Sequence, residues 1–374
     1  MVGIVFLIQS VYILSYFFTS TSKIISIKSL IFALIFTIFQ LITIFSSSLT
    51  IGINYIEIIN IFARFISVLI FLCIPSKLLI NKLGFTKFMK LIVYLGLVAS
   101  LYNILANFSE MFNILNINNP YAVNFSSFYL NRNSFAQLLF MATIANTFLY
   151  TNERTKFNLI CYFIFSINIF ATLSRTVIAC VLIFFSILLI IHFRKEIKAQ
   201  NFILTLIISL VIIIRSNQEV SSFITNMIIR KDYGTSGRLV LWNFAFEILN
   251  KTNWVLGIGY ISSVDIIKRM GYSLNEFHSF YIETLVGGGI IDLFLHILIF
   301  IFCFKNVKII YYNDNITGIV YFAAYISFLL YGLVESVSFF TMGYVGTLFT
   351  IFIVTIPLLY SNSFKYGGCN DKCK

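Results

Sequence analysis

The sequence predicts an all-α, polytopic membrane protein, a transmembrane helical bundle of about 10–12 spans. Of its 374 residues, 59% are hydrophobic and only 11% are charged, whereas a soluble domain carries about 25% charged residues. Apolar runs close to the roughly 20 residues of helix that cross a bilayer recur along the whole chain. The chain contains only three prolines, which suits long unbroken helices. A soluble protein of this length would need polar surface that this chain lacks.

The first eight spans are expected within residues 1–214. The first has no basic segment before it and no small-residue cleavage site after it, so it is expected to be a helix rather than a removed signal peptide. The eighth is short, and the moderately polar stretch 109–130 could hold one further helix. The eight segments cover roughly residues 2–18, 29–46, 56–74, 88–108, 134–150, 157–173, 176–193 and 201–214.

One long segment, residues 215–281, separates the eighth span from the ninth and is the only sizeable piece expected outside the membrane. Long ordered loops are usually functional, so this segment is a candidate functional element. Residues 282–374 are expected to hold the last three spans and a cytoplasmic tail from residue 361. These spans cover roughly residues 282–304, 317–334 and 339–360.

The charges predict which connections face the cytoplasm. Together with Lys90, one set of segments holds 16 of the 26 basic residues, and the positive-inside rule places that set in the cytoplasm. It consists of residues 19–28, 75–87, 151–156, 192–200, 305–316 and the tail. The opposite side receives residues 47–55, 109–133, 174–175 and 215–281.

Lysine and arginine are also segregated across the membrane. The cytoplasmic side carries fourteen Lys and two Arg, and the external side carries seven Arg and three Lys. The planar guanidinium pairs with phosphate in a bidentate way. This asymmetry favours an external, phosphate-bearing anion at membrane level, although any single Arg could instead contact lipid phosphate or pair with Glu or Asp. The external arginines are Arg64, Arg132, Arg175, Arg215, Arg230, Arg238 and Arg269.

The long external segment contains a predicted amphipathic helix at residues 235–250. Leu239, Trp242, Phe246 and Leu249 fall on one helical face, which is expected to lie at the membrane surface or against the bundle. A G-I-G sequence follows at residues 257–259. Because position 262 is Ser, the third glycine of a dinucleotide fingerprint is absent, and a structural turn is the preferred interpretation.

Four polar side chains are candidates for either a site role or a structural role. His278 lies where the external segment re-enters the membrane, and it could exchange a proton near neutral pH or serve the structure alone. His192 is expected at a cytoplasmic helix end, and His296 is expected to be packed and hydrogen-bonded. Glu335 is either an exposed helix-end carboxylate or a base or partner for an Arg.

Other chemical motifs are weak or absent in the sequence. There is no P-loop, HExxH or GxSxG motif. Cys369 and Cys373 lack further Cys or His partners for a zinc site, and the four cysteines within spans are expected to be apolar fillers. Residues 287–289, three consecutive glycines, are expected to permit close helix packing.

The order of several motifs resembles the O-antigen ligase and polymerase superfamily of bacterial polysaccharide assembly. The resemblance is strongest over residues 173–293, where an S-R pair precedes G-R with a nearby Trp, G-x-G, a His and a Gly-rich helix start. Asn131-Arg132-Asn133 also looks like a family feature. The family more often has Asn after the histidine, whereas this chain has Ser279. The matching segments are LSRT at 173–176, SGRLVLWNFAFEIL at 236–249, LGIGY at 256–260 and HSFYIETLVGGGIIDL at 278–293.

The resemblance implies a multi-pass glycosyltransferase of the bacterial cytoplasmic (inner) membrane, with its active site facing outside. Its donor would be a glycan on undecaprenyl pyrophosphate, and its acceptor another lipid-linked repeat unit or a lipid A core. Membrane lipids, a flippase and a chain-length regulator are implied partners, with no nucleic acid. No cofactor and no metal are expected, because no metal cluster is visible in the sequence.

The family motifs assign roles to six residues. Arg175 and Arg238 match the two family arginines that would stabilise the leaving pyrophosphate. His278 matches the family histidine, which would accept the acceptor proton or orient the hydroxyl. Arg132, Arg64 and Glu335 are expected to assist substrate binding.

Polymerase is favoured over ligase, which shares the motifs and remains the enzymatic alternative. A transporter or flippase of lipid-linked oligosaccharide is the alternative from another class. Such a transporter would be expected to show inverted halves and helices broken at mid-membrane. The sequence has no convincing internal repeat, and its polar candidates cluster at one face.

The charge pattern makes a direct prediction about topology. In a background lacking native cysteines, a cysteine near residue 225 or 268 should react with an impermeant thiol reagent from outside. A cysteine near residue 82 or 196 should react only after the cells are permeabilised. The opposite labelling pattern would place the arginine set in the cytoplasm and remove the basis for an external site.

Overall fold

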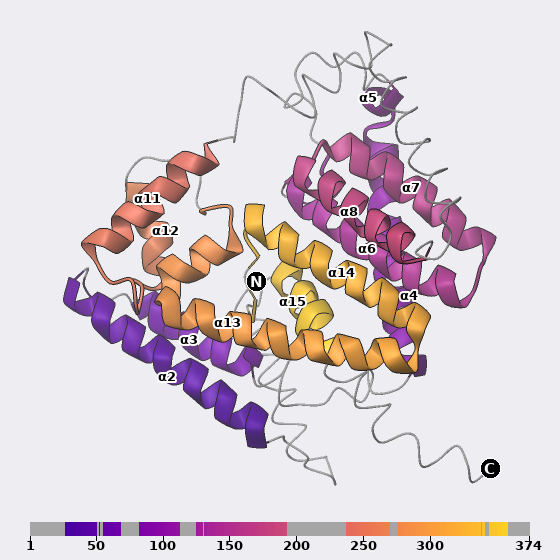
Figure 1. The fold of residues 1–374 in the computed structure, drawn as a ribbon. Coiled ribbons are helices and arrows are strands. Elements are labelled where there is room, and N and C mark those ends of the chain that lie inside the picture. Colours follow the sequence, from indigo (N-terminus) through magenta and orange to yellow (C-terminus); the bar gives the residue numbers. More distant parts are fainter. Residues whose placement is uncertain are drawn as a thin grey trace, which may run out of the picture. The chain divides into compact units, whose positions relative to one another are not determined.

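In the computed structural model every regular element among the described residues is a helix, with no strand among them (Figure 1). This confirms the all-α class. The predicted spans at 2–18 and 201–214 lie outside the described residues. The described residues are 27–50, 52, 55–68, 82–112, 125–129, 131–192, 237–269, 276–337, 339–340 and 344–357.

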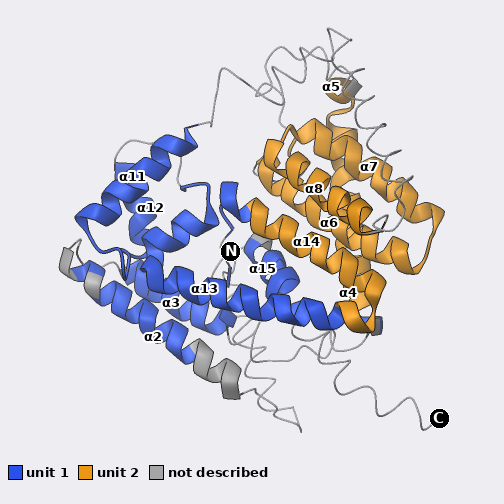
Figure 2. Cartoon of the chain, viewed as in Figure 1, with its two compact units in different colours: residues 1–84, 235–310, 332–374 blue, residues 85–234, 311–331 orange. Residues whose placement is uncertain are grey.

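The chain divides into two compact units (Figure 2). Unit 1 comprises residues 1–84, 235–310 and 332–374, and unit 2 comprises residues 85–234 and 311–331. These packing units cut across the sequence-based division into 1–214, 215–281 and 282–374. That division describes topology rather than packing, and it stays a prediction.

Unit 2 contains helices whose bounds lie close to the predicted spans, except that its first helix begins at Lys82, six residues before the predicted start and inside the expected loop 75–87. Its long helices are α4 (Lys82–Ala106), α6 (Arg132–Asn152), α7 (Lys156–Thr172), α8 (Arg175–His192) and α14 (Asn315–Val334). The short α5 (Phe108–Phe112) follows α4. Apolar periodicity finds these helices well because each must shield its backbone polar groups over the same membrane thickness.

Helix α6 lies at the centre of unit 2, since every residue from Phe135 to Leu149 is buried. Its polar side chains therefore bond to protein: Asn146 Nδ2 donates to the Asn158 carbonyl oxygen of α7 at 2.9 Å, and the Tyr162 hydroxyl donates to Thr147 Oγ1 at 2.8 Å. A helix enclosed on all sides needs no lipid-facing stripe, which explains why its sequence is more polar than that of its neighbours.

Unit 1 is built around α13 (Phe280–Asn313). The other helices of this unit are α2 (Ile27–Thr50), α3 (Tyr55–Val68), α11 (Arg238–Lys251), α12 (Tyr260–Arg269) and α15 (Tyr344–Thr350), which continues into the π-helix η5 (Ile351–Thr355). The predicted eleventh span, 339–360, is thus only partly regular α-helix within the described residues.

Helix α13 corrects the expected loop at 305–316. The helix continues to Asn313, and Asp314 alone separates it from α14. The Asp314 carboxylate accepts hydrogen bonds from the Thr317 N–H at 3.1 Å and the Thr317 hydroxyl at 2.8 Å, and so caps α14. Hydropathy detects only the apolar part of a helix, so it missed the polar turns that follow residue 304.

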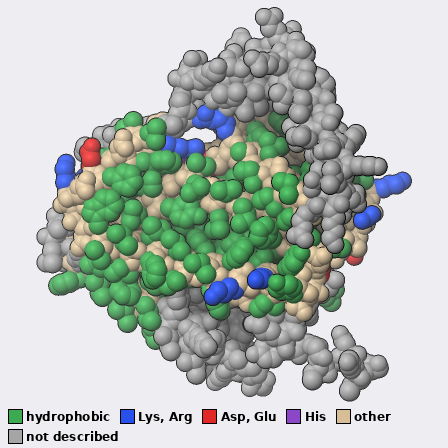
Figure 3. Space-filling model, in the orientation of Figure 1, with side chains coloured by type: hydrophobic (Ala, Val, Ile, Leu, Met, Phe, Trp, Pro, Cys, Tyr) green, Lys and Arg blue, Asp and Glu red, His purple; other side chains and the backbone are tan. Residues whose placement is uncertain are grey.

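Many large hydrophobic side chains remain exposed on the helices, including Phe45, Leu105, Phe163 and Tyr312. Figure 3 shows hydrophobic side chains covering much of the visible described surface. Three described helical stretches are long and apolar enough to cross a membrane: Leu83–Ala106, Phe280–Asn313 and Asn315–Val334. Apolar exposure on this scale is typical of a lipid-facing surface, and the chain is a membrane protein.

The predicted apolar face of α11 is buried only in part. Leu249 of that face packs in a core cluster with Leu241, Ala245 and Ile248, whereas Leu239 and Phe246 are exposed, as a face at the membrane surface would be. The helix is apolar on both sides, so periodicity alone could not select the buried stripe. The structure selects the one that packs against the segments before and after α12.

Helix α13 is broken near its start at Gly289, whose φ of 72° and ψ of −172° are not helical. Residues 254–259, which join α11 to α12, run across the break. The N–H groups of residues 290 and 291 donate to the carbonyls of residues 254 and 255, at 2.9 and 3.3 Å. Those of residues 258 and 259 donate to the carbonyls of residues 286 and 287, at 2.9 and 2.8 Å.

Glycines make this close backbone contact possible. Gly257, at φ 71°, and Gly259, at φ 91°, form the predicted structural turn. A Cβ on Gly289 would lie 2.1 Å from the Val255 carbonyl oxygen, and a Cβ on Gly257 would lie 2.6 Å from the Gly289 nitrogen. The predicted close packing at residues 287–289 is therefore real, with the 254–259 segment among its partners.

We predict that Gly289→Ala destabilises the protein. The new Cβ would clash with backbone at a left-handed φ, and strain of this kind costs about 1–3 kcal/mol. Thermal unfolding in detergent should show a lower midpoint. Gly332→Ala is the matched control, because the nearest atom to its Cβ would be Phe280 Cβ at an ordinary 3.5 Å. Equal midpoints for the two variants would contradict the packing described above.

Candidate functional site

Three of the predicted site arginines occupy the first residue of a helix. Arg132 begins α6, Arg175 begins α8 and Arg238 begins α11. None of these three helices has an acidic residue in its first turn. A cation at a helix N-terminus opposes the helix dipole, at a cost of about 0.3–1 kcal/mol at an exposed position. An anion or a carboxylate beside such a helix start would offset this cost.

Local sequence sets these helix starts. Asn131 caps α6, because its side chain accepts a hydrogen bond from the Ser134 N–H at 2.8 Å. Leu173 ends α7 with a left-handed φ of 53°, and α8 begins two residues later at Arg175. Gly237, with φ 77°, precedes Arg238 at the start of α11. Arg132 and Arg175 belong to unit 2, and Arg238 belongs to unit 1.

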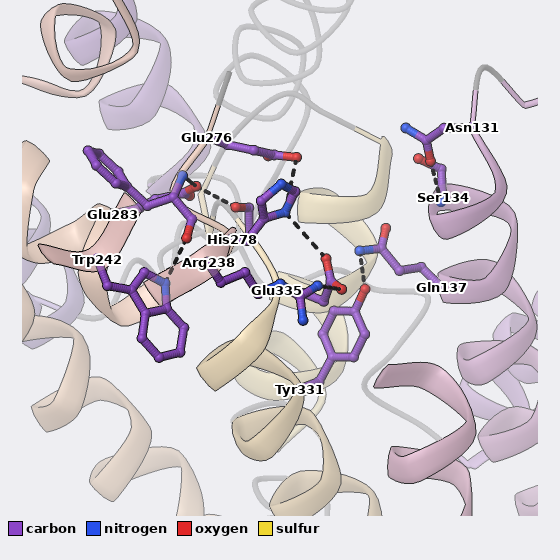
Figure 4. Close-up of polar contacts among 12 residues, drawn as sticks. Asn131, Ser134, Gln137, Arg238, Trp242, Glu276, His278, Glu283, Tyr331 and Glu335 are labelled. Atoms are coloured by element: carbon purple, nitrogen blue, oxygen red, sulfur yellow. Dashed lines mark hydrogen bonds and ion pairs between the residues drawn. The ribbon is translucent and has the colours of Figure 1, made fainter. Parts of the chain in front are cut away.

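Arg238, Glu335 and His278 come together within unit 1 (Figure 4). Arg238 Nη2 donates to Glu335 Oε1 at 2.5 Å. His278 Nδ1 lies 3.8 Å from Glu335 Oε2 and 3.8 Å from Glu276 Oε1. Glu335 is 6% exposed, so it is the arginine partner that the sequence left as one alternative and not an exposed helix-end carboxylate.

The carboxylates favour the protonated form of His278. Glu335 is the largest influence, and although burial opposes the proton, the pKa of His278 is raised above its ordinary value of 6.5. The positive charge of Arg238 acts in the opposite direction and lowers the pKa of His278. The side chain can therefore carry a proton at neutral pH more readily than an isolated histidine.

The His278 backbone is held in an uncommon conformation, with φ of 53°. On one side of it, the Phe277 carbonyl accepts a hydrogen bond from Trp242 Nε1 of α11 at 2.9 Å. On the other side, the Phe280 N–H donates to the Glu335 carbonyl at 3.2 Å. A left-handed non-glycine residue persists only where its surroundings fix it, and such residues concentrate at functional sites.

Ser279, where this chain departs from the family pattern, lies at the start of α13. The Glu283 N–H donates to its carbonyl oxygen at 2.9 Å, and the Ile282 N–H approaches its hydroxyl oxygen at 3.5 Å. Ser and Asn are among the preferred N-cap residues. The substitution of one for the other is therefore explained by helix capping, without a chemical role for the side chain.

Sequence reasoning missed Glu283, which Figure 4 shows beside His278. Its Oε1 accepts hydrogen bonds from the Phe277 N–H at 3.1 Å and from the Ser336 hydroxyl. Glu276 was also missed, although it lies as close to His278 Nδ1 as Glu335 does. A signal was present: an acidic residue at the start of an apolar span is costly and often functional.

Arg64 has different partners from Arg238. It is 3% exposed, and its guanidinium lies over the Tyr260 ring, 3.6 Å from the centroid. The Tyr260 hydroxyl donates to Asp292 Oδ2 at 2.7 Å, and burial raises the pKa of this phenol, which keeps it a donor. Nearby, the Glu57 carboxylate accepts the N–H groups of residues 260–262 at 2.6–3.1 Å and caps α12.

The structure also describes His296 and three of the cysteines. His296 is packed and hydrogen-bonded as predicted, because it is fully buried and its Nδ1 lies 2.9 Å from the Asp292 carbonyl oxygen. Cys161, Cys180 and Cys303 are buried within helices. Among the described residues, no group of three or more His, Cys, Asp or Glu is arranged to hold a metal ion.

Comparison with known families gives one match: residues 160–297 match a family model described as O-antigen ligase. The matched range contains Arg175, Arg238 and His278, so the resemblance to the O-antigen ligase and polymerase superfamily is confirmed. This family comprises glycosyl-transferring enzymes and implies lipid-linked glycan substrates. A search of curated proteins gave no match.

We predict that Glu335→Gln lowers the pKa of His278, because the variant removes the largest cause of its rise. In the parent, this pairing stabilises the folded state fully below pH 6.5 and loses that effect as pH rises through the raised pKa. Histidine-selective NMR titration, with His192 and His296 replaced, would measure the change. Glu276→Gln should have a smaller effect, since Glu276 is 51% exposed. A larger effect from Glu276→Gln would contradict this assignment.

Proposed function

We propose that this chain, whose residues 160–297 match the O-antigen ligase family, is a polysaccharide polymerase. It would join repeat units carried on undecaprenyl pyrophosphate, at the external face of the bacterial cytoplasmic membrane. The observation that carries the proposal is the convergence of Arg238 and His278 on one carboxylate, Glu335. A group that binds anions and a group that accepts protons are the two that glycosyl transfer from a pyrophosphate requires.

The proposed reaction assigns His278 to the acceptor. A hydroxyl of the acceptor sugar attacks the anomeric carbon of the donor, its proton passes to the neutral form of His278, and the bond to the pyrophosphate oxygen breaks. Since His278 Nδ1 faces the Glu276 and Glu335 carboxylates, Nε2 on the other side of the ring is the nitrogen that would take the proton. Glu335 would then stabilise the imidazolium, as a carboxylate does in other His-containing catalytic groups.

The arginines are assigned to the leaving group. Negative charge grows on the pyrophosphate as the glycosidic bond breaks, and cations already in place stabilise it without reorganisation. Arg238 provides such a cation beside His278 within unit 1, and Arg175 and Arg132 of unit 2 keep only the roles that the family motifs imply. Arg64 is left out of this role because it is buried over Tyr260.

The same chemistry serves a ligase, which differs only in its acceptor. A polymerase uses the lipid-linked repeat unit as both donor and acceptor, so it is the version that needs one substrate class alone. A transporter of lipid-linked oligosaccharide is less well supported, because the movement of a lipid requires no proton acceptor beside an arginine. The two enzymatic versions are separated by their products.

We predict that purified protein converts the lipid-linked repeat unit into a ladder of longer products. His278→Ala should lower the rate by about 10²–10⁴, the usual contribution of general acid–base catalysis. Binding of undecaprenyl pyrophosphate should persist, because the arginines remain. Both measurements belong on the same folded preparation, with His192→Ala as the control from the expected cytoplasmic side.

Three outcomes would contradict parts of this proposal. Normal turnover by His278→Ala would remove the assigned proton acceptor. Loss of lipid binding together with turnover would place His278 in the pyrophosphate site instead. If the parent forms product only after a second acceptor such as a lipid A core is added, then the protein is a ligase.

A further inference from the structure

We infer that Glu283 is a positioning residue for His278 and Glu335. This inference rests on the proposed function of these two side chains. Glu283 lies in the first turn of α13 and is partly buried. It contacts neither of those side chains through a hydrogen bond of its own. Its carboxylate instead holds the two backbone segments that carry them.

One oxygen makes both connections. Glu283 Oε1 accepts the Phe277 N–H at 3.1 Å and also accepts the Ser336 hydroxyl. Phe277 directly precedes His278, and Ser336 directly follows Glu335. The carboxylate therefore ties together two segments that are nearly sixty residues apart in sequence, each one residue away from a proposed site residue (Figure 4).

The site needs such a tie because neither segment is held by regular helix. His278 has a left-handed backbone just before α13, and Glu335 follows the last residue of α14. The only backbone hydrogen bond described between the segments runs from the Phe280 N–H to the Glu335 carbonyl. The 3.8 Å separation between His278 Nδ1 and Glu335 Oε2 therefore depends on how both segments are held. A misplacement of about 1 Å at a catalytic group can lower the rate by about 10²-fold.

The position of Glu283 in the first turn of α13 does not by itself explain both of its hydrogen bonds. A carboxylate in the first turn of a helix is favoured by the helix dipole, which offsets part of the cost of an acidic residue in an apolar span. Helix capping alone would satisfy that principle, since a glutamate in the first turn often bonds to a preceding N–H. The bond to Ser336 lies outside any cap, and it is the one that reaches the Glu335 segment.

Two substitutions separate the hydrogen bonds from the charge. Glu283→Gln keeps a carbonyl oxygen that can accept from both donors, whereas Glu283→Leu keeps the approximate volume and removes the acceptor. We expect Glu283→Leu to lower kcat by about tenfold to a hundredfold, with KM little changed. Glu283→Gln should retain most of kcat. Thr284→Val is the matched control, because it alters a buried hydroxyl with no hydrogen-bond partner among the described residues.

Coupling to His278 distinguishes positioning from stability. In a His278→Ala background the proposed base is absent, so Glu283→Leu should cause no further loss of kcat. A loss of the same size in both backgrounds would show that Glu283 only maintains the fold, and an unchanged kcat for Glu283→Leu alone would overturn the inference. If Glu283→Gln were as impaired as Glu283→Leu, the charge and not the hydrogen bonds would matter.

A structural measurement keeps this test separate from the proposed activity. Histidine-selective NMR on the full-length protein, with His192 and His296 replaced, reports the His278 ring whether or not product forms. Glu283→Leu and Ser336→Ala should both shift or broaden that resonance, and Thr284→Val should not. If the parent protein forms no polymer but the His278 resonance changes in these variants, then the proposed function is wrong and the positioning role of Glu283 is still supported. An unchanged resonance in both variants would overturn the positioning role itself.

Discussion

Within a bilayer every backbone N–H and C=O must find its partner inside the protein, and the break in α13 is where this constraint bears most directly on the chain. The break at Gly289 releases polar groups that a continuous helix would pair internally. Residues 254–259 supply partners through four backbone hydrogen bonds, two on each side of the break. The same six residues join α11 to α12, so satisfying the break also anchors the helix that Arg238 begins and the helix that Glu57 caps.

A single carboxylate dominates the electrostatics of the candidate site. Glu335 receives a proton-bearing nitrogen of Arg238 on one oxygen and faces His278 with the other. The two neighbours compete, because the guanidinium reduces the attraction that the carboxylate offers to a histidine proton. The raised pKa of His278 shows that the carboxylates prevail over both this competition and the burial of the ring.

The sequence predicted the helices of unit 2 well, because apolar length is fixed by membrane thickness and α6, α7 and α8 begin and end within about two residues of the expected bounds. Short motifs in the sequence also identified Arg238 and His278 as candidate site residues. The sequence could not tell which stripe of α11 is buried, since both are apolar, nor that Glu335 pairs with Arg238 across 97 positions. Glu283 carried a signal in the sequence, as an acidic residue at the start of an apolar span, whereas the proximity of Glu276 to His278 comes only from folding.

The complete burial of α6 has a consequence for how the chain enters the membrane. Its middle residues, from Phe135 to Leu149, have no lipid-facing side, and the helix is absent from the described stretches that are apolar enough to span a bilayer alone. Transfer of such a segment into lipid by itself would leave Gln137 and Asn146 without the partners that they have in other helices, Tyr331 and the Asn158 carbonyl. Asn146 has its partner in α7, and Thr147 also accepts a hydrogen bond from Tyr162 of that helix, so packing of α7 against α6 would offset part of this cost.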